Sequence, residues 1–150
     1  MSKREHDISV LNDLIEVTLD SAHGYTDAVH DVANPHFKTL FGKRGVERKQ
    51  IAATLQTEVR RLLGGDPAQS GTVLGKIHRE FMNLKAAISG SDAGIVASVE
   101  AGEDHIKKQY DKALQDLAIS SPVREIIQAA YGSVVDGHNE MRDLKRLIQD

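Results

Sequence analysis

Apolar residues recur every three or four positions along most of this 150-residue chain, which is the period of an amphipathic α-helix. Helix-breaking sequences interrupt the pattern at 34–35 (Asn-Pro), 64–67 (Gly-Gly-Asp-Pro), 89–92 (Ser-Gly-Ser-Asp) and 121–122 (Ser-Pro). The pattern therefore predicts five helices, over roughly residues 8–33, 35–63, 72–88, 92–118 and 121–149. No stretch alternates with a period of two, so we expect an all-α fold.

Four of these predicted helices are long, and the connections near residues 34 and 120 are short. Short connections make each pair of flanking helices an antiparallel hairpin, and the shorter segment 72–88 can carry the chain from one hairpin to the other. We therefore predict a ferritin-like antiparallel four-helix bundle of two hairpins with an extra short crossover helix. Residues 8–150 would form this single domain, and the charged residues 1–7 a flexible N-terminus.

Composition narrows the classes of protein further. The chain has no cysteine, which excludes disulfides and thiolate metal ligands and favours a cytoplasmic location. Its net charge is −3 with both signs mixed along the chain, so we expect no nucleic-acid partner. No apolar run approaches the roughly 20 residues that cross a bilayer, so we expect no membrane partner.

Polar residues interrupt the apolar stripes at similar positions in four helices. Glu103 lies within the stripe of segment 92–118 and His138 within that of segment 121–149. Arg44 and Arg48 lie on the stripe of the second segment, and Tyr25 on that of the first. Because a helix rises 1.5 Å per residue, counting from the two short turns places Glu103 level with His138, and Arg44 and Arg48 level with Tyr25. If the crossover segment returns the chain as in a ferritin-like bundle, the two levels coincide, and Glu47 lies at the same height. We therefore predict one buried polar layer.

Four glycines occur at the height of this layer: Gly24, Gly45, Gly102 and Gly137. A glycine inside a helix costs roughly 1 kcal/mol relative to alanine. Four of them at one level indicate close helix approach, a helix irregularity, or room for a small ligand.

The polar layer permits a metal interpretation. Glu47, Glu103 and His138 are the candidate ligands, since ferritin-like di-metal sites combine inward glutamates with Glu-x-x-His pairs. The match is incomplete: Gln50 stands where Glu47 would need a histidine three residues later, and Val135 stands where a glutamate would precede His138. The two arginines of the layer would also repel a dication.

The alternative is a buried network of Tyr25, Arg44, Arg48, Glu103 and His138. A buried charge persists only when it is paired, so Glu103 would be neutralised by Arg44 or Arg48 and hydrogen-bonded to His138. A third interpretation is a small-ligand pocket. A further polar stripe, Glu16, Asp20, His23, Asp27 and His30, lies opposite the apolar face of its helix, and we interpret it as a solvated surface.

Several stretches, above all Asn-Asp-Leu-Ile-Glu at 12–16 and Met-Asn-Leu-Lys at 82–85, together with Gly-Glu-Asp at 102–104, resemble a family of small bacterial ferritin-like four-helix-bundle proteins of unknown function. The resemblance spans residues 8–148 and implies a ferritin-like fold and a bacterial origin. Members of that family often carry an acidic residue where this chain has Ala22, a departure that weakens the metal interpretation.

These observations together favour a non-catalytic ferritin-like bundle in which a buried Glu/His/Arg network replaces a degenerate metal site. We expect no cofactor, self-association as a homo-oligomer such as a dimer, and by family analogy a stress-related role. The first alternative is an enzyme, a di-iron or di-manganese carboxylate protein acting as a ferroxidase or oxidase. The second is a bundle that binds a small ligand.

Overall fold

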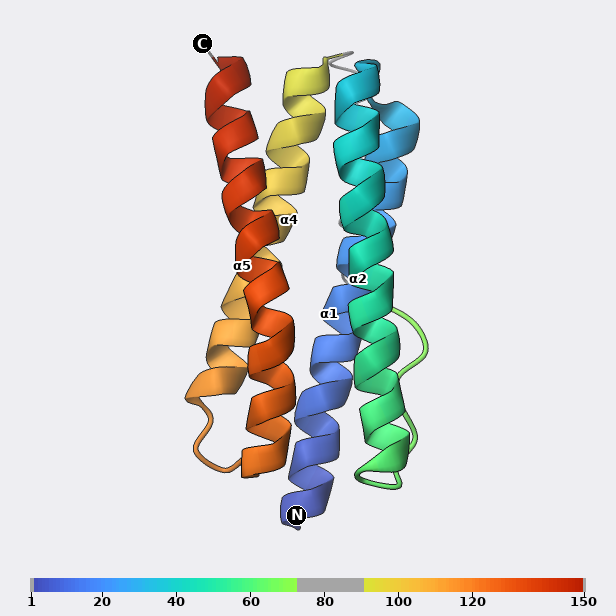
Figure 1. The fold of residues 1–150 in the computed structure, drawn as a ribbon, viewed down its shortest axis with the longest axis vertical. Helices are drawn as coiled ribbons and strands as arrows, with labels where there is room; N and C mark the ends of the chain where they lie inside the picture. The colour runs from blue at the N-terminus through green and yellow to red at the C-terminus, as the bar shows by residue number, and fades with distance from the viewer. Residues whose placement is uncertain (1, 73–90, 150) are drawn as a thin grey trace.

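The computed structural model describes residues 2–72 and 91–149, which contain four long helices and no β-strand. These are α1 (Lys3–Asp31), α2 (Pro35–Arg61), α4 (Asp92–Gln115) and α5 (Ser121–Gln149). Figure 1 shows them side by side in one bundle, with α1 and α5 running in one direction and α2 and α4 in the other. The expected all-α four-helix bundle with two antiparallel hairpins is therefore confirmed.

Local capping explains where the helices start. The side chains of Ser2, Asn34 and Ser91 each accept a hydrogen bond from a backbone N–H in the first turn of the helix that follows. Because Ser2 caps α1, residues 3–7 form the first turns of this helix, where we had expected a flexible segment. Arg4 then donates to the backbone oxygens of Leu63 and Gly64, just after the end of α2.

The starts of α2, α4 and α5 agree with the predicted ones, and α1 and α2 each end two residues before the predicted bound. α4 ends at Gln115 instead of residue 118, because the Asp116 side chain accepts the backbone N–H of Ala118 and turns the chain away. Leu117, which lies in the turn that follows, is 91% exposed. The crossover helix predicted over 72–88 lies outside the described residues apart from Thr72.

The core consists of two apolar clusters separated by a charged layer. One cluster surrounds Leu11, Leu55 and Ile127, and the other surrounds Phe41 and Met141. Arg48 and Glu103, the largest buried charged residues, are 0% and 1% exposed and belong to neither cluster. The bundle therefore places an ion pair where apolar packing would be the simplest solution.

The helices do not pack equally against their neighbours. α1 packs extensively on α2 and also on α4, and α4 packs on α5, whereas α2 and α5 touch least among adjacent helices. Within residues 2–72 and 91–149, no helix is both long and apolar enough to cross a membrane.

The N-terminal turn of α1 also clamps the connection between α4 and α5. Asp7 is 3% exposed and accepts the backbone N–H of Ser120 at 3.0 Å. We expect Asp7→Ala to lower the free energy of unfolding by about 1–3 kcal/mol, because it leaves a backbone donor without its acceptor. Urea denaturation measures this. Asp13→Ala, an exposed position on the same helix, should change it by less than about 0.5 kcal/mol. Equal effects would contradict the clamp.

Candidate functional site

Glu103 on α4 is the centre of the buried polar layer. Arg48 on α2 approaches both carboxylate oxygens at 2.9 Å, which is a bidentate ion pair. Tyr25 on α1 donates its hydroxyl to Oε1 of Glu103 at 2.6 Å. Three strong donors on one carboxylate compensate for the loss of water around it, so the group is fixed in place.

Arg48 is held as tightly as its partner. Its second Nη1 contact goes to the Ser21 hydroxyl at 2.9 Å, and its guanidinium carbon lies 5.8 Å from the centre of the Tyr25 ring. Burial acts to lower the pKa of Arg48, but the charge and hydrogen bond of Glu103, together with Tyr25 and Glu47, outweigh burial, and the pKa is raised. Arg48 Nε is buried without a hydrogen-bond partner among the described residues.

Two of the four glycines make room for this layer. A Cβ on Gly137 of α5 would lie 2.3 Å from Arg48 Nη2 and 3.2 Å from Glu103 Oε2. A Cβ on Gly45 of α2 would lie 3.2 Å from Tyr25 Cβ, so α1 and α2 approach closely there. Gly24 and Gly102 have nothing within 4 Å of the corresponding position. Two of the four glycines therefore face the polar layer, and two do not.

The other predicted members of the layer lie at its edges. Arg44 turns toward the seam between α2 and α5, where it donates to Glu47 and to Glu140 at 3.0 Å each. The Glu47 side chain is 38% exposed and also accepts from Ser133.

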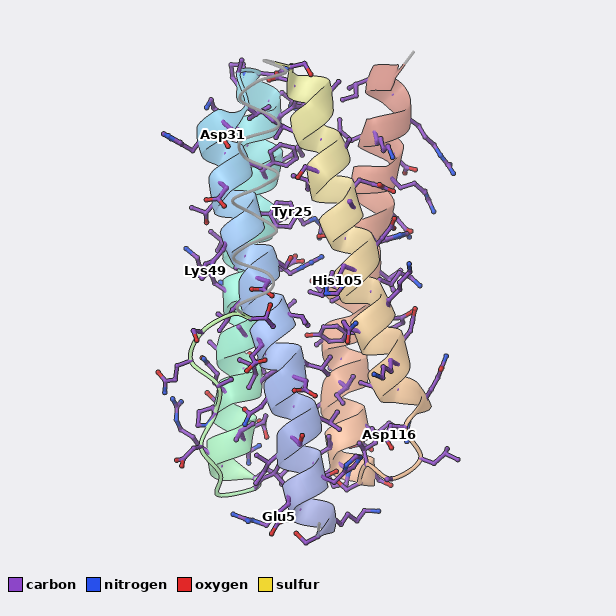
Figure 2. All side chains as sticks on the ribbon, turned by 180° about the vertical axis from the view of Figure 1, so that it is seen from behind. Glu5, Tyr25, Asp31, Lys49, His105 and Asp116 are labelled. Carbon is purple, nitrogen blue, oxygen red and sulfur yellow. The ribbon has the colours of Figure 1, made fainter. Side chains whose placement is uncertain are left out.

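His138 lies at the opposite edge, on the seam between α4 and α5. Its Nε2 is 2.7 Å from Asp104, and the His138 side chain is 17% exposed. Figure 2 views the bundle from the side opposite to Figure 1, with Tyr25 pointing inward between the helices. Of the five residues predicted to form one network, Tyr25, Arg48 and Glu103 thus meet, while Arg44 and His138 pair with acids at the surface.

Comparison with known protein families gives a match over most of the chain. The family model described as "Domain of unknown function (DUF2383)" matches residues 6–116. The chain belongs to the DUF2383 family. A search of curated proteins gave no match.

The DUF2383 match covers α1, α2 and α4, and therefore all three residues of the Tyr25–Glu103–Arg48 cluster. The match ends before α5. Gly137 on α5, which leaves room for the Arg48 and Glu103 side chains, therefore lies outside the matched region. In this DUF2383 chain, the three residues of the buried cluster thus lie in the matched region, and the glycine that makes room for them lies on α5, outside it.

The donor chemistry of this layer does not fit a di-metal centre. Its one buried carboxylate, Glu103, already accepts from a guanidinium that carries the positive charge a metal would bring. Glu47 and His138 face different seams, each with its own partner. Within the described ranges, no three histidine, aspartate or glutamate side chains gather closely enough to hold an ion. Two or more inward carboxylates are what such centres require.

Some partners in the DUF2383 layer were missed by the sequence patterns. Ser21 and Glu140 bind the two arginines, and Asp104 binds His138. Asp104 directly follows Glu103, so its side chain leaves the helix about 100° away, toward the seam. A search for carboxylates one position from an inward residue would have found it.

Two buried tyrosines of this DUF2383 protein have raised pKa values. Burial raises the pKa of Tyr110 to about 12, although its bond to Thr18 and the charge of Arg48 oppose this, and burial beside Glu103 raises the pKa of Tyr25 well above its usual value. A tyrosine whose pKa is higher in the folded protein than in the unfolded protein stabilises the fold. This stabilisation is complete below the unfolded pKa of about 10, and it is lost as the pH rises toward the folded pKa.

We therefore expect tyrosinate absorbance in the native protein to rise only well above pH 10, and stability to fall over the same range. The unfolded protein in urea serves as the control, with a midpoint near pH 10. A native midpoint that coincides with the unfolded one would contradict the buried hydroxyls.

Proposed function

We propose that this chain is a non-catalytic helical bundle of ferritin-like topology, in which a buried ion-pair network replaces a metal centre. One observation carries the proposal: the buried carboxylate Glu103 is bound by a bidentate contact from Arg48 and by the Tyr25 hydroxyl. A metal ion would have to displace the guanidinium from this carboxylate, and proton transfer would have to break the bidentate ion pair. The protein would therefore work through its surface.

The order of helix directions supports the ferritin-like part of this proposal. α1 and α2 form one antiparallel hairpin, α4 and α5 form the other, and α2 and α4 run in the same direction. A long connection between α2 and α4 is then required, as in bundles with one crossover. No described residue carries the stress-related role expected by analogy, and the proposal does not extend to it.

The test is metal analysis and oxygen consumption of the full chain purified without a histidine tag. We expect iron and manganese far below one ion per chain, and no oxygen consumption after Fe(II) is added. Near-stoichiometric iron or manganese that is lost in Glu103→Gln would overturn the proposal, as would Fe(II)-dependent oxygen consumption lost in the same variant.

A control separates surface binding from core binding. His23 and His30 are exposed on α1 and can bind metal adventitiously. Metal that disappears in the His23→Ala, His30→Ala variant, but stays in Glu103→Gln, belongs to the surface and leaves the proposal standing.

A further inference from the structure

The side of the bundle formed by α2 and α5 carries charges of opposite sign on its two halves. An exposed stripe at intervals of three or four residues on α2 consists of Lys43, Val46, Gln50, Thr54, Thr57 and Arg61. The corresponding stripe on α5 consists of the half-buried Glu140 and the exposed Glu125, Ala129, Gly132, Asp136, Asp143 and Leu147. Every charge of the first stripe is positive and every charge of the second is negative.

The two stripes border the same seam. Arg44 follows Lys43 on α2 and binds Glu140 on α5, whose position at three and four residues from Asp143 and Asp136 places it beside the acidic stripe. Figure 1 looks onto this side, with α2 and α5 in front of α1 and α4. The stripes therefore form one surface, which we call the α2–α5 face.

Among the described residues, most charges of the two stripes form no ion pair with another helix. Across residues 2–72 and 91–149, Lys43, Glu125 and Asp136 take part in no ion pair, and all three are exposed. Within those same ranges, Arg61 and Asp143 pair only with neighbours on their own helices. The residues between the charges are mostly small or uncharged, so another helix could approach closely.

Symmetry makes this face complementary to itself. In a two-fold dimer with its axis parallel to the helices, α2 of one copy faces α5 of the other, and heights along the bundle are preserved. The Arg44–Glu140 bond shows that residue 43 is level with about residue 140 on α5. Lys43 would then lie between Asp136 and Asp143 of the second copy. By the same register, Arg61 lies within about one helical turn of Glu125.

We propose that the α2–α5 face is the interface of a symmetric dimer of this chain, with each cationic α2 stripe against the acidic α5 stripe of the second copy. A polyanion or an anionic lipid surface would be attracted by the α2 half but repelled by the α5 half. A second copy satisfies both halves at once. The proposal adds a partner and a surface to the proposed function and does not depend on whether the core binds metal.

Sedimentation velocity of the full chain at increasing concentration tests the dimer. We expect a monomer–dimer equilibrium that shifts toward monomer as salt is added, because exposed ion pairs are screened. A chain that stays monomeric at all concentrations in low salt would overturn the proposal.

Charge reversal then tests the face itself. The cationic stripe is reversed in Lys43→Glu, Arg61→Glu, and the acidic stripe in Glu125→Lys, Asp136→Lys, Asp143→Lys. Each variant alone would set like charges against each other, and we expect its dimerisation to weaken by about tenfold or more. Mixing the two variants in equal amounts restores opposite charges at both contacts, so a heterodimer should form.

A matched control reverses two exposed cations on α4 instead, in Lys108→Glu, Lys112→Glu, and should dimerise as the wild type does. Circular dichroism confirms that each variant keeps its helices, and Asp136→Lys alone replaces the triple variant if that one unfolds. Reversed variants that still dimerise alone would overturn the proposal. So would a mixture that stays monomeric although both variants are folded.

Discussion

Replacing Glu103 with alanine should lower the free energy of unfolding by about 3–5 kcal/mol, because the substitution leaves a buried guanidinium without its counter-charge. Arg48 is 0% exposed and donates two of its hydrogen bonds to this carboxylate, so it cannot turn to solvent without disrupting the core. Tyr25 would lose its acceptor as well. Urea denaturation of Glu103→Ala against wild type measures the loss.

Two controls define what the loss means. His138→Ala removes the partly exposed partner of Asp104 and should cost only about 0–1 kcal/mol. The double variant Glu103→Leu, Arg48→Met removes both charges and should recover much of the stability, since apolar replacement of a buried pair is often neutral or stabilising. A loss below about 1 kcal/mol in Glu103→Ala would refute the buried pair as the structure describes it.

Substituting Gly137 with alanine should destabilise the protein by about 2–4 kcal/mol, since the new Cβ would lie 2.3 Å from Arg48 Nη2. The end of an arginine usually moves aside easily. Here Arg48 is bound to Glu103 and to Ser21 inside the bundle, so moving it breaks the ion pair or pushes α5 away.

Gly102 provides the matched comparison. It occupies a similar height on α4, but a Cβ there meets nothing within 4 Å. Gly102→Ala should raise stability by about 0.5–1 kcal/mol, because alanine is the better helix former. The two glycine substitutions should therefore have opposite signs in thermal or urea unfolding. A stabilising Gly137→Ala would mean that α5 does not approach the ion pair this closely.

The periodicity of apolar residues was sufficient for the architecture. Asn34 and Pro35 start α2 as predicted, because capping and a fixed proline φ act within one turn of chain. The sequence also predicted correctly that three polar residues lie in the core. Each is on the apolar stripe of its helix, one turn from a buried apolar residue: Tyr25, Arg48 and Glu103. Local sequence therefore determined which faces of the helices point inward.

Which polar residues meet was decided only by tertiary packing. Arg44 and Arg48 lie one turn apart on the same stripe, yet only Arg48 reaches Glu103, while Arg44 turns to Glu140 on the seam. His138 likewise pairs with Asp104. A small rotation of a helix about its axis moves a marginal residue from core to seam, and sequence spacing does not fix that rotation.

The sequence by itself thus determined the helices, their hairpins and the burial of a carboxylate near an arginine, because these follow from periodicity and capping within single helices. The tertiary structure decided that Gly137 and not Gly102 faces that pair, and that opposite charges line the two halves of the α2–α5 face. Both features depend on how separate helices are rotated against each other, which is set by the packing of the whole core.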